Sequence, residues 1–434
     1  MSPFIAELPI RGRKINTAEI ITVGTELLLG QTLNTNARDL ALELSELGIS
    51  SFYQVVVGDN PERLEKVLRQ SLDRADLVIT TGGLGPTEDD ITMEISAKIA
   101  GTDLVCSKQA EGWIREFFAV RGRKPSGNNW KQALLPLKSK ILYNSVGTAP
   151  GALYQLDHEG TKKYLALLPG PPAEMKQMFQ QELKPWLETC ADERLYHVYL
   201  RTIGLGESSL TDEIADVIHA QNEISIAPYA SLGEVMLRLS LMGPKEIATE
   251  ELEQRFSPVI EQIKSRVGEY IYSEDNKTLP EVVLDLLAER QATVGFAESC
   301  TGGLISAELT KIPGASKVFT GGVVSYSNEI KKSLLGVSSE VLRDEGAVSE
   351  GCALAMAAGA RSLLGVDYAV AITGIAGPEG GSKDKPVGTI WIGLADEEKT
   401  TAQHFLIGGD RAQIRKIATL TALDVLRKRL LRIV

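Results

Sequence analysis

The chain has 434 residues, of which 43% are hydrophobic and 24% are charged, and its formal net charge is −11. This composition is typical of a folded globular protein, and the length suggests two to four domains. The negative charge is a poor electrostatic match for DNA or anionic lipid, so nucleic acid is not expected as a partner. No run of about 18 apolar residues occurs, so we expect no membrane span.

The cysteines and the start of the chain indicate a compartment. The four cysteines form no C-x-x-C pair and no cluster with histidine. That usage argues against a structural zinc site and a disulfide framework, and it favours a reducing cytoplasm. Residues 1–17 lack the continuous apolar core of a signal peptide and are interpreted as an N-terminal extension.

Strand and helix patterns alternate from residue 18 onward. Apolar and β-branched runs at 19–23, 52–57 and 77–80 predict strands, while residues 33–47 and 62–72 have helical spacing. This alternation predicts an α/β domain with a doubly wound parallel sheet, over residues 18–175. Ligands of such sheets bind at the carboxyl ends of the strands.

A glycine-rich loop follows the third predicted strand. Its small residues let a phosphate or a ribose approach the backbone closely. The candidate ligand-binding residues in this loop are Gly82, Gly83, Gly85 and Thr87.

Carboxylates crowd beside this loop. Glu88, Asp89 and Asp90 would repel a bound phosphate unless a divalent cation lay between the carboxylates and the phosphate. The same pattern is also typical of a plain loop in which Asp90 caps a helix. Asp59 ends the second strand, and Asn34 and Asn36 fall on the same rim, which favours a binding site with Asp59, Asp89 and Asp90 as metal ligands.

Residues 176–272 form a second part. Strands are predicted at 195–203, 224–227 and 235–241, and helices at 208–219 and 246–267, with a hairpin around residues 231–233. This is a small α+β module. Its histidines, His197 and His219, are interpreted as surface or packing residues, and no chemistry is evident in it.

The third part, residues 273–434, is predicted to be a further α/β domain and carries a hydroxyl nucleophile. An apolar run at 292–297 predicts a strand that ends at Ser299 and meets the start of a helix. Unpaired N–H groups at that helix start, around Thr301, Gly302 and Gly303, would be open to an anion or oxyanion. Cys300 is a rival nucleophile, and the chemistry alone does not separate it from Ser299.

A Ser-His-Asp triad is not expected. No G-x-S-x-G elbow occurs, and His404 lies in a predicted strand without a motif. Lys331 could act as a base when neutral, with Tyr326 as a proton relay, since burial lowers the pKa of a lysine. The alternative is that Lys331 and Lys332 are two solvated surface charges.

Two later segments add candidates. The loop with Thr373, Gly374, Ala376 and Gly377 follows a predicted strand at 368–372 and suits an oxyanion hole or amide recognition, or is a plain Gly-Pro turn. Arg411 and Arg415 share one helix face and either hold a phosphate or lie on the surface.

Ordered motifs in residues 18–175 resemble the N-terminal domain of CinA proteins, which is similar to molybdopterin-binding domains. The resemblance implies a metal-dependent ADP-ribose pyrophosphatase, with Asp59 and Asp90 as key acids and a cation of the Mg, Mn or Co class. Asp89 could serve as base or ligand. The motifs are Gly24-Thr25-Glu26-Leu27-Leu28-x-Gly30, Thr81-Gly82-Gly83-Leu84-Gly85-Pro86-Thr87, Asp90-x-Thr92, Gly147-Thr148-Ala149-Pro150-Gly151 and Leu168-Pro169-Gly170-Pro171-Pro172.

The third part resembles the CinA C-terminal domain, the nicotinamide mononucleotide deamidase family. The resemblance implies a cofactor-free deamidase with Ser299 as nucleophile, Lys331 as general base and Tyr326 assisting. It also implies that Thr373, Gly374 and Ala376 line the pocket. The motifs are Ala297-Glu298-Ser299-Cys300-Thr301-Gly302-Gly303, Tyr326-Ser327-Asn328-Glu329-x-Lys331, Gly346-Ala347-Val348-Ser349-Glu350, Thr373-Gly374-Ile375-Ala376-Gly377-Pro378, Lys385-Pro386-Val387-Gly388-Thr389 and Gly409-Asp410-Arg411.

The middle part is similar to the KH-like module between these domains. It lacks a G-x-x-G loop in a basic setting, which disfavours RNA binding. The whole resemblance implies a homodimer that acts on nicotinamide mononucleotide and ADP-ribose. The alternative is a molybdopterin-binding or competence-related interaction protein in which one or both sites are inactive.

Overall fold

The computed structural model describes residues 14–220 and 223–433. They divide into two compact units. One contains the chain up to Tyr196 together with Met242–Ala248, and the other contains His197–Leu241 with Thr249 onward. Of the expected N-terminal extension, residues 1–13 lie outside the described part, and the first strand begins at Thr17.

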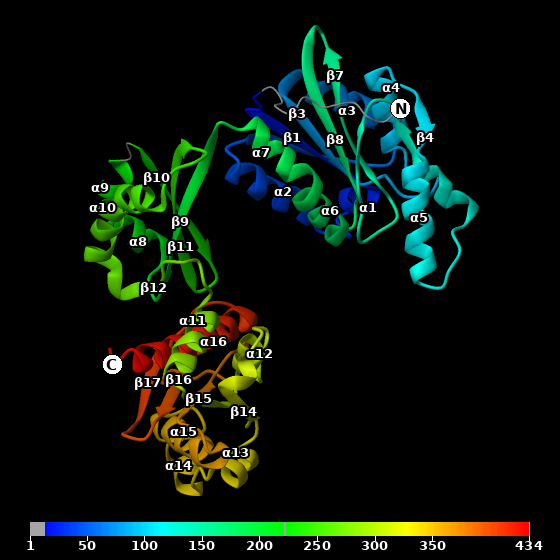
Figure 1. The fold of residues 1–434 in the computed structure, drawn as a ribbon. Coiled ribbons are helices and arrows are strands. Elements are labelled where there is room, and N and C mark those ends of the chain that lie inside the picture. The colour runs from blue at the N-terminus through cyan, green and yellow to red at the C-terminus, as the bar shows by residue number, and fades with distance from the viewer. Residues whose placement is uncertain (1–13, 221–222, 434) are drawn as a thin grey trace. The chain divides into compact units, whose positions relative to one another are not determined.

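The N-terminal domain is built on a six-stranded sheet (Figure 1). The strands β2, β1, β3 and β8 run parallel to one another, and β7 pairs antiparallel with both β8 and the edge strand β6. In spatial order the strands are β2 (Ser50–Val57), β1 (Thr17–Val23), β3 (Leu77–Thr81), β8 (Thr161–Leu168), β7 (Gly151–His158) and β6 (Lys140–Leu142).

Helices cover both faces of this sheet. Successive strand residues point to opposite sides, so Ile20 and Ile79 belong to one hydrophobic core while Ile21 and Val78 belong to the other. The remaining elements are α1 (Thr25–Leu28), α2 (Thr35–Glu46), α3 (Pro61–Arg74), α4 (Thr92–Ala100), β4 (Leu104–Cys106), α5 (Lys108–Val120), η1 (Gly127–Ala133), β5 (Leu134–Pro136), α6 (Pro172–Met178), η2 (Phe179–Leu183) and α7 (Lys184–Cys190).

The N-terminal domain extends beyond the expected boundary at residue 175. Phe179, Leu183 and Trp186 are buried in the same core as α2 and the sheet. Their burial requires η2 and α7 to fold with the first domain, so the domain continues to Cys190.

The middle module is a four-stranded sheet with helices. Ser231 pairs with Glu234 across the β10–β11 turn, which confirms the predicted hairpin. The helix predicted over 208–219 is interrupted at Ile214, which joins two shorter helices. The elements are β9 (Glu193–Ile203), α8 (Glu207–Glu213), α9 (Ala215–His219), β10 (Ile224–Ser231), β11 (Glu234–Pro244), α10 (Thr249–Val267), η3 (Gly268–Tyr270) and β12 (Ile271–Ser273).

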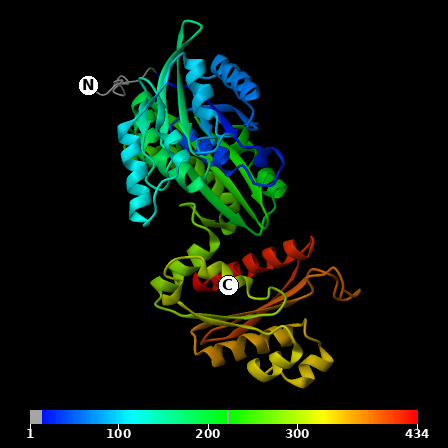
Figure 2. The ribbon, with the colours of Figure 1, turned by 90° about the vertical axis from the view of Figure 1, so that its right-hand side faces the viewer.

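The C-terminal domain has a five-stranded sheet in the order β14-β13-β15-β16-β17. Helices α11, α12 and α16 cover one face, and α13, α14 and α15 cover the other (Figure 2). The elements are α11 (Leu279–Glu289), β13 (Val294–Glu298), α12 (Leu304–Thr310), η4 (Ala315–Lys317), β14 (Phe319–Val324), α13 (Asn328–Leu335), α14 (Ser339–Asp344), α15 (Glu350–Leu364), β15 (Tyr368–Gly374), β16 (Thr389–Ala395), β17 (Thr400–Leu406) and α16 (Arg411–Leu430).

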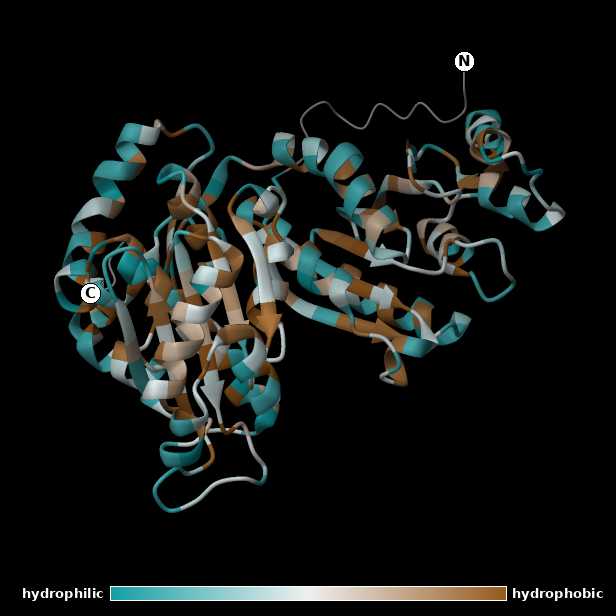
Figure 3. Cartoon of the chain, turned by 90° about the horizontal axis from the view of Figure 1, so that it is seen from below, coloured by the Kyte–Doolittle hydropathy of each residue, from teal (hydrophilic) through white to brown (hydrophobic). Residues whose placement is uncertain are grey.

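Hydrophobic residues concentrate on the strands, and the outer faces of the helices are hydrophilic (Figure 3). In the described residues, no helix is long and apolar enough to cross a bilayer.

Candidate active sites

Ser299 lies at the carboxyl edge of the C-terminal sheet. Strand β13 ends at the preceding residue, and the Ser299 N–H donates to the carbonyl of Ile372 at 3.0 Å. The side chain is only 8% exposed. The parallel strands β14 and β15 flank β13, so the segments that follow all three strands meet at this position.

Lys331 meets Ser299 from helix α13, whose first turn is capped by Ser327. Its Nζ lies 3.0 Å from the Ser299 hydroxyl oxygen and 2.7 Å from the carbonyl oxygen of Ser325. Lys331 is 1% exposed, and no ion pair in the described residues involves it. Because burial disfavours the charged form, the pKa of Lys331 is lowered from its ordinary value.

This geometry can give a neutral lysine a defined hydrogen-bond pattern. A neutral amine has two N–H donors and one lone pair. The carbonyls of Ser325 and Tyr326, at 2.7 and 3.5 Å, accept the two N–H groups. The lone pair is then left for the hydroxyl proton of Ser299. Lys332 differs, since its amine pairs with Glu329 at the surface.

Cys300 faces a different environment from Ser299. Its side chain is buried within the hydrophobic core that lies under α11, α12 and α16. Burial raises the pKa of the Cys300 thiol to about 11, which disfavours the reactive thiolate. Of the two residues that the sequence left open as nucleophiles, Ser299 is the one whose side chain contacts the Lys331 amine.

The start of helix α12 differs from the expectation of free N–H groups. The helix begins at Leu304, and the Glu298 carboxylate accepts hydrogen bonds from the N–H groups of Ile305 and Ser306 and of Gly303. The N–H groups of Gly303, Ile305 and Ser306 are therefore not open to an anion, and that of Gly302 donates to the carbonyl of Ser299 at 3.1 Å. The N–H of Thr301 makes no hydrogen bond to another backbone group among the described residues. The buried Glu298 carboxylate already interacts with the positive end of the α12 helix dipole.

The turn between Ser299 and α12 is held from the other side by α16. Arg415 donates to the carbonyls of Cys300 and Thr301 at 3.1 and 2.6 Å. Gly302 and Gly303 have φ of +62° and +96°, which favour glycine. Arg415 therefore shapes the turn that carries Ser299.

Tyr326 is 61% exposed, and its hydroxyl accepts a hydrogen bond from Arg411 at 3.0 Å. Arg411 also donates to the carbonyl of Gly377 at 2.7 Å. In the described residues no hydrogen bond joins the Tyr326 hydroxyl to Ser299 or Lys331. In this structure the Tyr326 hydroxyl thus pairs with Arg411 and not with the Ser299–Lys331 pair.

The loop after β15 lies next to Ser299. The register pairs Ile372 with Glu298, which places Thr373 beside Ser299. The buried Thr373 hydroxyl donates to the carbonyl of Ala347 at 2.7 Å. A Cβ at Gly374 would lie 2.8 Å from the carbonyl of Thr389, so only glycine fits there. The N–H groups of Ala376 and Gly377 take part in no hydrogen bond among the described residues.

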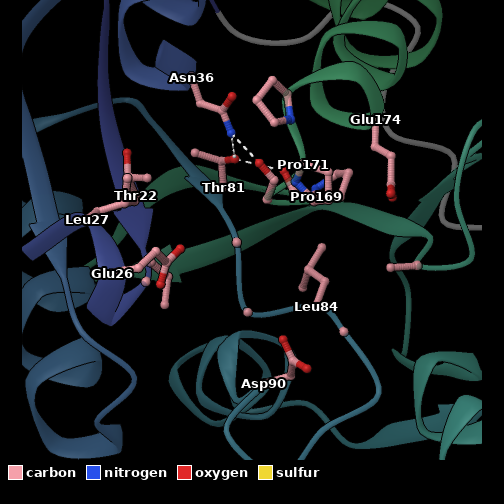
Figure 4. A pocket seen from close by; sticks show the side chains of 18 of the residues that line it. Thr22, Glu26, Leu27, Asn36, Thr81, Leu84, Asp90, Pro169, Pro171 and Glu174 are labelled. Atoms are coloured by element: carbon pink, nitrogen blue, oxygen red, sulfur yellow. Dashed lines mark hydrogen bonds between the residues drawn. The ribbon is translucent and has the colours of Figure 1, made fainter. Parts of the chain in front are cut away.

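The N-terminal domain contains a cavity of about 600 Å³ at the carboxyl ends of β1 and β3 (Figure 4). Thr87 does not line the cavity, but it donates to the Asp90 carboxylate. The candidate residues that line it are Asn34, Asn36, Asp59, Gly82, Gly83, Gly85, Asp89 and Asp90. Other lining residues are Glu26, Gln132 and Glu174, which the sequence reasoning did not single out.

The glycine loop is tightly packed. A Cβ at Gly82, whose φ is +106°, would lie 2.2 Å from the carbonyl oxygen of Val23. A Cβ at Gly85 would lie 2.4 Å from the carboxylate of Asp90. Glycine is therefore required at Gly82, where the loop passes close to the backbone of β1, whereas a Cβ at Gly85 would displace the Asp90 carboxylate.

The cavity lining is acidic. Its carboxylates belong to Glu26, Asp59, Asp89, Asp90 and Glu174, and no Lys, Arg or His occurs among its described lining residues. Such a lining repels a diphosphate unless a cation accompanies it, and carboxylates are the ligands that hard cations prefer. The residues present thus fit a divalent cation.

The carboxylates are nevertheless not assembled as a metal cage. The Asp59 carboxylate accepts from the N–H and hydroxyl of Thr25 at 3.0 and 2.8 Å. Within the described chain, no group of three or more His, Cys, Asp or Glu is placed to hold a metal ion. Part of the coordination of any cation would have to come from the ligand itself.

Comparison with known proteins matches three successive parts of the chain to family models. Residues 19–189 match the profile of a probable molybdopterin binding domain, residues 197–273 that of the damage-inducible protein CinA KH domain, and residues 276–430 that of the CinA C-terminal domain. The protein thus joins a molybdopterin-binding-like domain, a KH-like module and a CinA C-terminal domain, which confirms the predicted fold class.

The chain belongs to the CinA family. It is 45% identical over 413 residues to the CinA-like protein of Dictyoglomus turgidum, covering 95% of this chain and 99% of that protein. It is 44% identical over 415 residues to a putative competence-damage inducible protein of Clostridium beijerinckii, covering 96% and 100%. A solved structure of competence damage-inducible protein A from Klebsiella pneumoniae is 35% identical and covers 35% of this chain and 95% of that one, with a TM-score of 0.35.

Proposed function

We propose that this chain is a bifunctional hydrolase of pyridine-nucleotide salvage. The C-terminal domain deamidates nicotinamide mononucleotide to nicotinate mononucleotide and ammonia, without a cofactor. The N-terminal domain hydrolyses ADP-ribose to AMP and ribose 5-phosphate. The observation that carries the first activity is the buried contact of 3.0 Å between the Lys331 amine and the Ser299 hydroxyl.

In the deamidation, Ser299 and Lys331 act as nucleophile and base. The Ser299 oxygen attacks the carboxamide carbon while Lys331 Nζ takes the hydroxyl proton. The C–N bond then breaks, and the proton on Nζ passes to the leaving nitrogen, which departs as ammonia. Water attacks the resulting ester, Nζ accepts its proton, and the ester C–O bond breaks as the proton returns to Ser299.

The N–H groups of the loop after β15 and the side chain of Arg411 would bind the amide substrate. The unbonded N–H groups of Ala376 and Gly377 are available to the carbonyl oxygen as it becomes negative. Among the described residues Arg411 pairs with no carboxylate, and its hydrogen bonds go to a tyrosine hydroxyl and a backbone carbonyl. Its full charge is available to the substrate phosphate.

In the N-terminal domain, the glycine loop binds the diphosphate and the carboxylates bind the cation. Gly82, Gly83 and Gly85 let the diphosphate approach the backbone, and the acceptors of Asn34 and Asn36 border the same space. A divalent cation of the Mg, Mn or Co class held by Asp59, Asp89 and Asp90 would screen the diphosphate charge and lower the pKa of the attacking water.

One assay tests both activities in the full-length chain. Ammonia release from nicotinamide mononucleotide and AMP release from ADP-ribose are measured with and without a chelator. We expect the chelator to abolish only AMP release. Ammonia release that needs metal, or that persists at the wild-type rate in Ser299→Ala, would contradict the Ser–Lys mechanism.

A further inference from the structure

Glu174 brings a carboxylate to the N-terminal cavity from helix α6. It is partly exposed and lines the cavity of about 600 Å³. Among the described residues its carboxylate accepts one hydrogen bond and forms no ion pair. An ionised carboxylate can accept about four hydrogen bonds, so most of the acceptor capacity of Glu174 is left for other groups.

Asn144 holds one oxygen of this carboxylate in place. The Asn144 Nδ2 donates to Glu174 Oε2 at 2.7 Å and to the carbonyl of Ala149 at 2.9 Å. The Asn144 Oδ1 accepts from the N–H groups of Val146 and Gly147 at 3.1 and 2.7 Å, which fixes the direction of the amide. A Cβ at Gly147 would lie 2.0 Å from Glu174 Oε2, so the carboxylate packs directly against this glycine. Glu174 is therefore an oriented group.

The second oxygen of Glu174, Oε1, is open to the solvent. It accepts no hydrogen bond among the described residues, and it is not one of the side-chain atoms that are buried without a partner. A ligand in the cavity can therefore reach it. Figure 4 shows the Glu174 side chain pointing from α6 toward the cavity, apart from Asp90 and Glu26. Glu174 thus lies away from Asp90, one of the acids proposed to bind the cation.

The chemistry of an open carboxylate limits what it can bind. An ionised carboxylate accepts hydrogen bonds and cannot donate them, and it repels phosphate groups. The complementary group on a nucleotide is therefore an O–H or N–H donor. In dinucleotide-binding sheets an acidic residue accepts a hydrogen bond from a ribose hydroxyl, and ADP-ribose carries two riboses.

We infer that Glu174 is a specificity-determining residue whose carboxylate accepts a hydrogen bond from a ribose hydroxyl of the bound ligand. This inference rests on the proposed function of the N-terminal cavity. It assigns the ribose contact to α6, whereas the diphosphate contact belongs to the glycine loop. A ligand that lacks the matching hydroxyl leaves the oriented carboxylate without its donor and binds less tightly.

The test compares ligands and variants of the full-length chain. The ligands are ADP-ribose, its deoxy analogues that each lack one hydroxyl of either ribose, and its hypoxanthine analogue, which lacks the adenine amino group. The variants are wild type, Glu174→Met and Glu174→Gln. The control is Glu116→Met, which removes a carboxylate that is exposed on α5 and lies outside the cavity lining. The readout is the ratio of kcat/KM for ADP-ribose to kcat/KM for each analogue.

Wild type should prefer ADP-ribose about 10- to 100-fold over the analogue that lacks the hydroxyl bound by Glu174, because a hydrogen bond to a charged group is lost. In Glu174→Met this ratio should fall to about one, while the ratios for the other analogues stay unchanged. Loss of a negative charge raises kcat/KM on every anionic ligand together, so it leaves the ratios unaffected. Glu174→Gln, which keeps the shape of the side chain without its charge, should reduce the same ratio. Glu116→Met should match wild type.

Three results would overturn the inference. The first is a set of ratios for the deoxy analogues that does not change in Glu174→Met. The second is a change confined to the hypoxanthine analogue, which would assign Glu174 to the adenine amino group. The third is an equal loss on all ligands with weaker binding of Mn²⁺ in a titration without nucleotide, which would make Glu174 a cation ligand. If no form hydrolyses ADP-ribose, the proposed activity fails separately, and calorimetric Kd values for the same panel decide the inference.

Discussion

Replacing Lys331 with methionine should strongly reduce ammonia release and, at neutral pH, make the protein more stable. The buried amine has a lowered pKa because its charge is poorly solvated. Methionine keeps the length of the side chain without the charge. At pH values below the folded pKa of Lys331, its amine is protonated in both the folded and the unfolded chain. The wild-type protein then bears the full free-energy cost of burying the charged amine.

The sign of the pH dependence follows from proton binding. Between the folded pKa of Lys331 and its ordinary value of 10.5, the unfolded chain binds a proton that the folded chain lacks. The free energy of unfolding of wild type therefore rises with pH in this window, by up to about 1.4 kcal/mol per pH unit. Lys331→Met lacks this increase, so the stability difference between the two proteins should shrink as the pH rises.

Denaturant unfolding at a series of pH values measures this difference. Trp391 lies in β16, so fluorine NMR of fluorotryptophan at this position reports the C-terminal sheet. The control is Lys332→Met, which removes a surface amine paired with Glu329 and should leave both stability and activity close to wild type. Ammonia release by Lys331→Met should fall about 10²- to 10⁴-fold. Parallel stability curves for wild type and Lys331→Met would mean that the amine stays charged, and the base role would be refuted.

Three other predictions concern residues of the two candidate sites. Cys300→Ala should retain ammonia release while Ser299→Ala loses it, and the opposite pattern in the same assay would make the thiol the nucleophile. Arg411→Met should raise KM for nicotinamide mononucleotide about 10- to 100-fold with little change in kcat. Arg415→Met should instead lower kcat and stability, because it frees the turn that carries Ser299. Equal increases of KM in the two variants would contradict the phosphate role of Arg411. Asp90→Asn should abolish AMP release and leave ammonia release unchanged, and a loss of both activities would contradict two independent sites.

The sequence predicted most of the helices and strands, and it predicted the sheet edges at which the candidate sites lie. The strand before Ser299 and the glycine loop after β3 were recognisable because apolar β-branched runs end in small and polar residues. Sequence order also placed Lys331 near the start of a helix after β14. It could not supply the 3.0 Å contact, which depends on how α13 packs beside β13.

The misses have physical causes in tertiary contacts. The sequence did not predict that the Glu298 carboxylate accepts hydrogen bonds at the start of α12. The position of that carboxylate depends on the path of the backbone between Glu298 and α12. The predicted end of the N-terminal domain at residue 175 was too early. The apolar residues of η2 and α7 do not show from the sequence alone whether they pack in the core of the first domain or in that of the middle module. Gln132 has no motif around it. Only the fold brings it to a loop that lies about 50 residues earlier in the chain.

Rapid quenching of the wild-type protein with nicotinamide mononucleotide, followed by mass spectrometry of its peptides, tests the Ser–Lys mechanism most directly. We predict a nicotinate mononucleotide ester on Ser299 that disappears in Ser299→Ala. An adduct on Cys300, or full ammonia release with no acyl intermediate on Ser299, would contradict the mechanism.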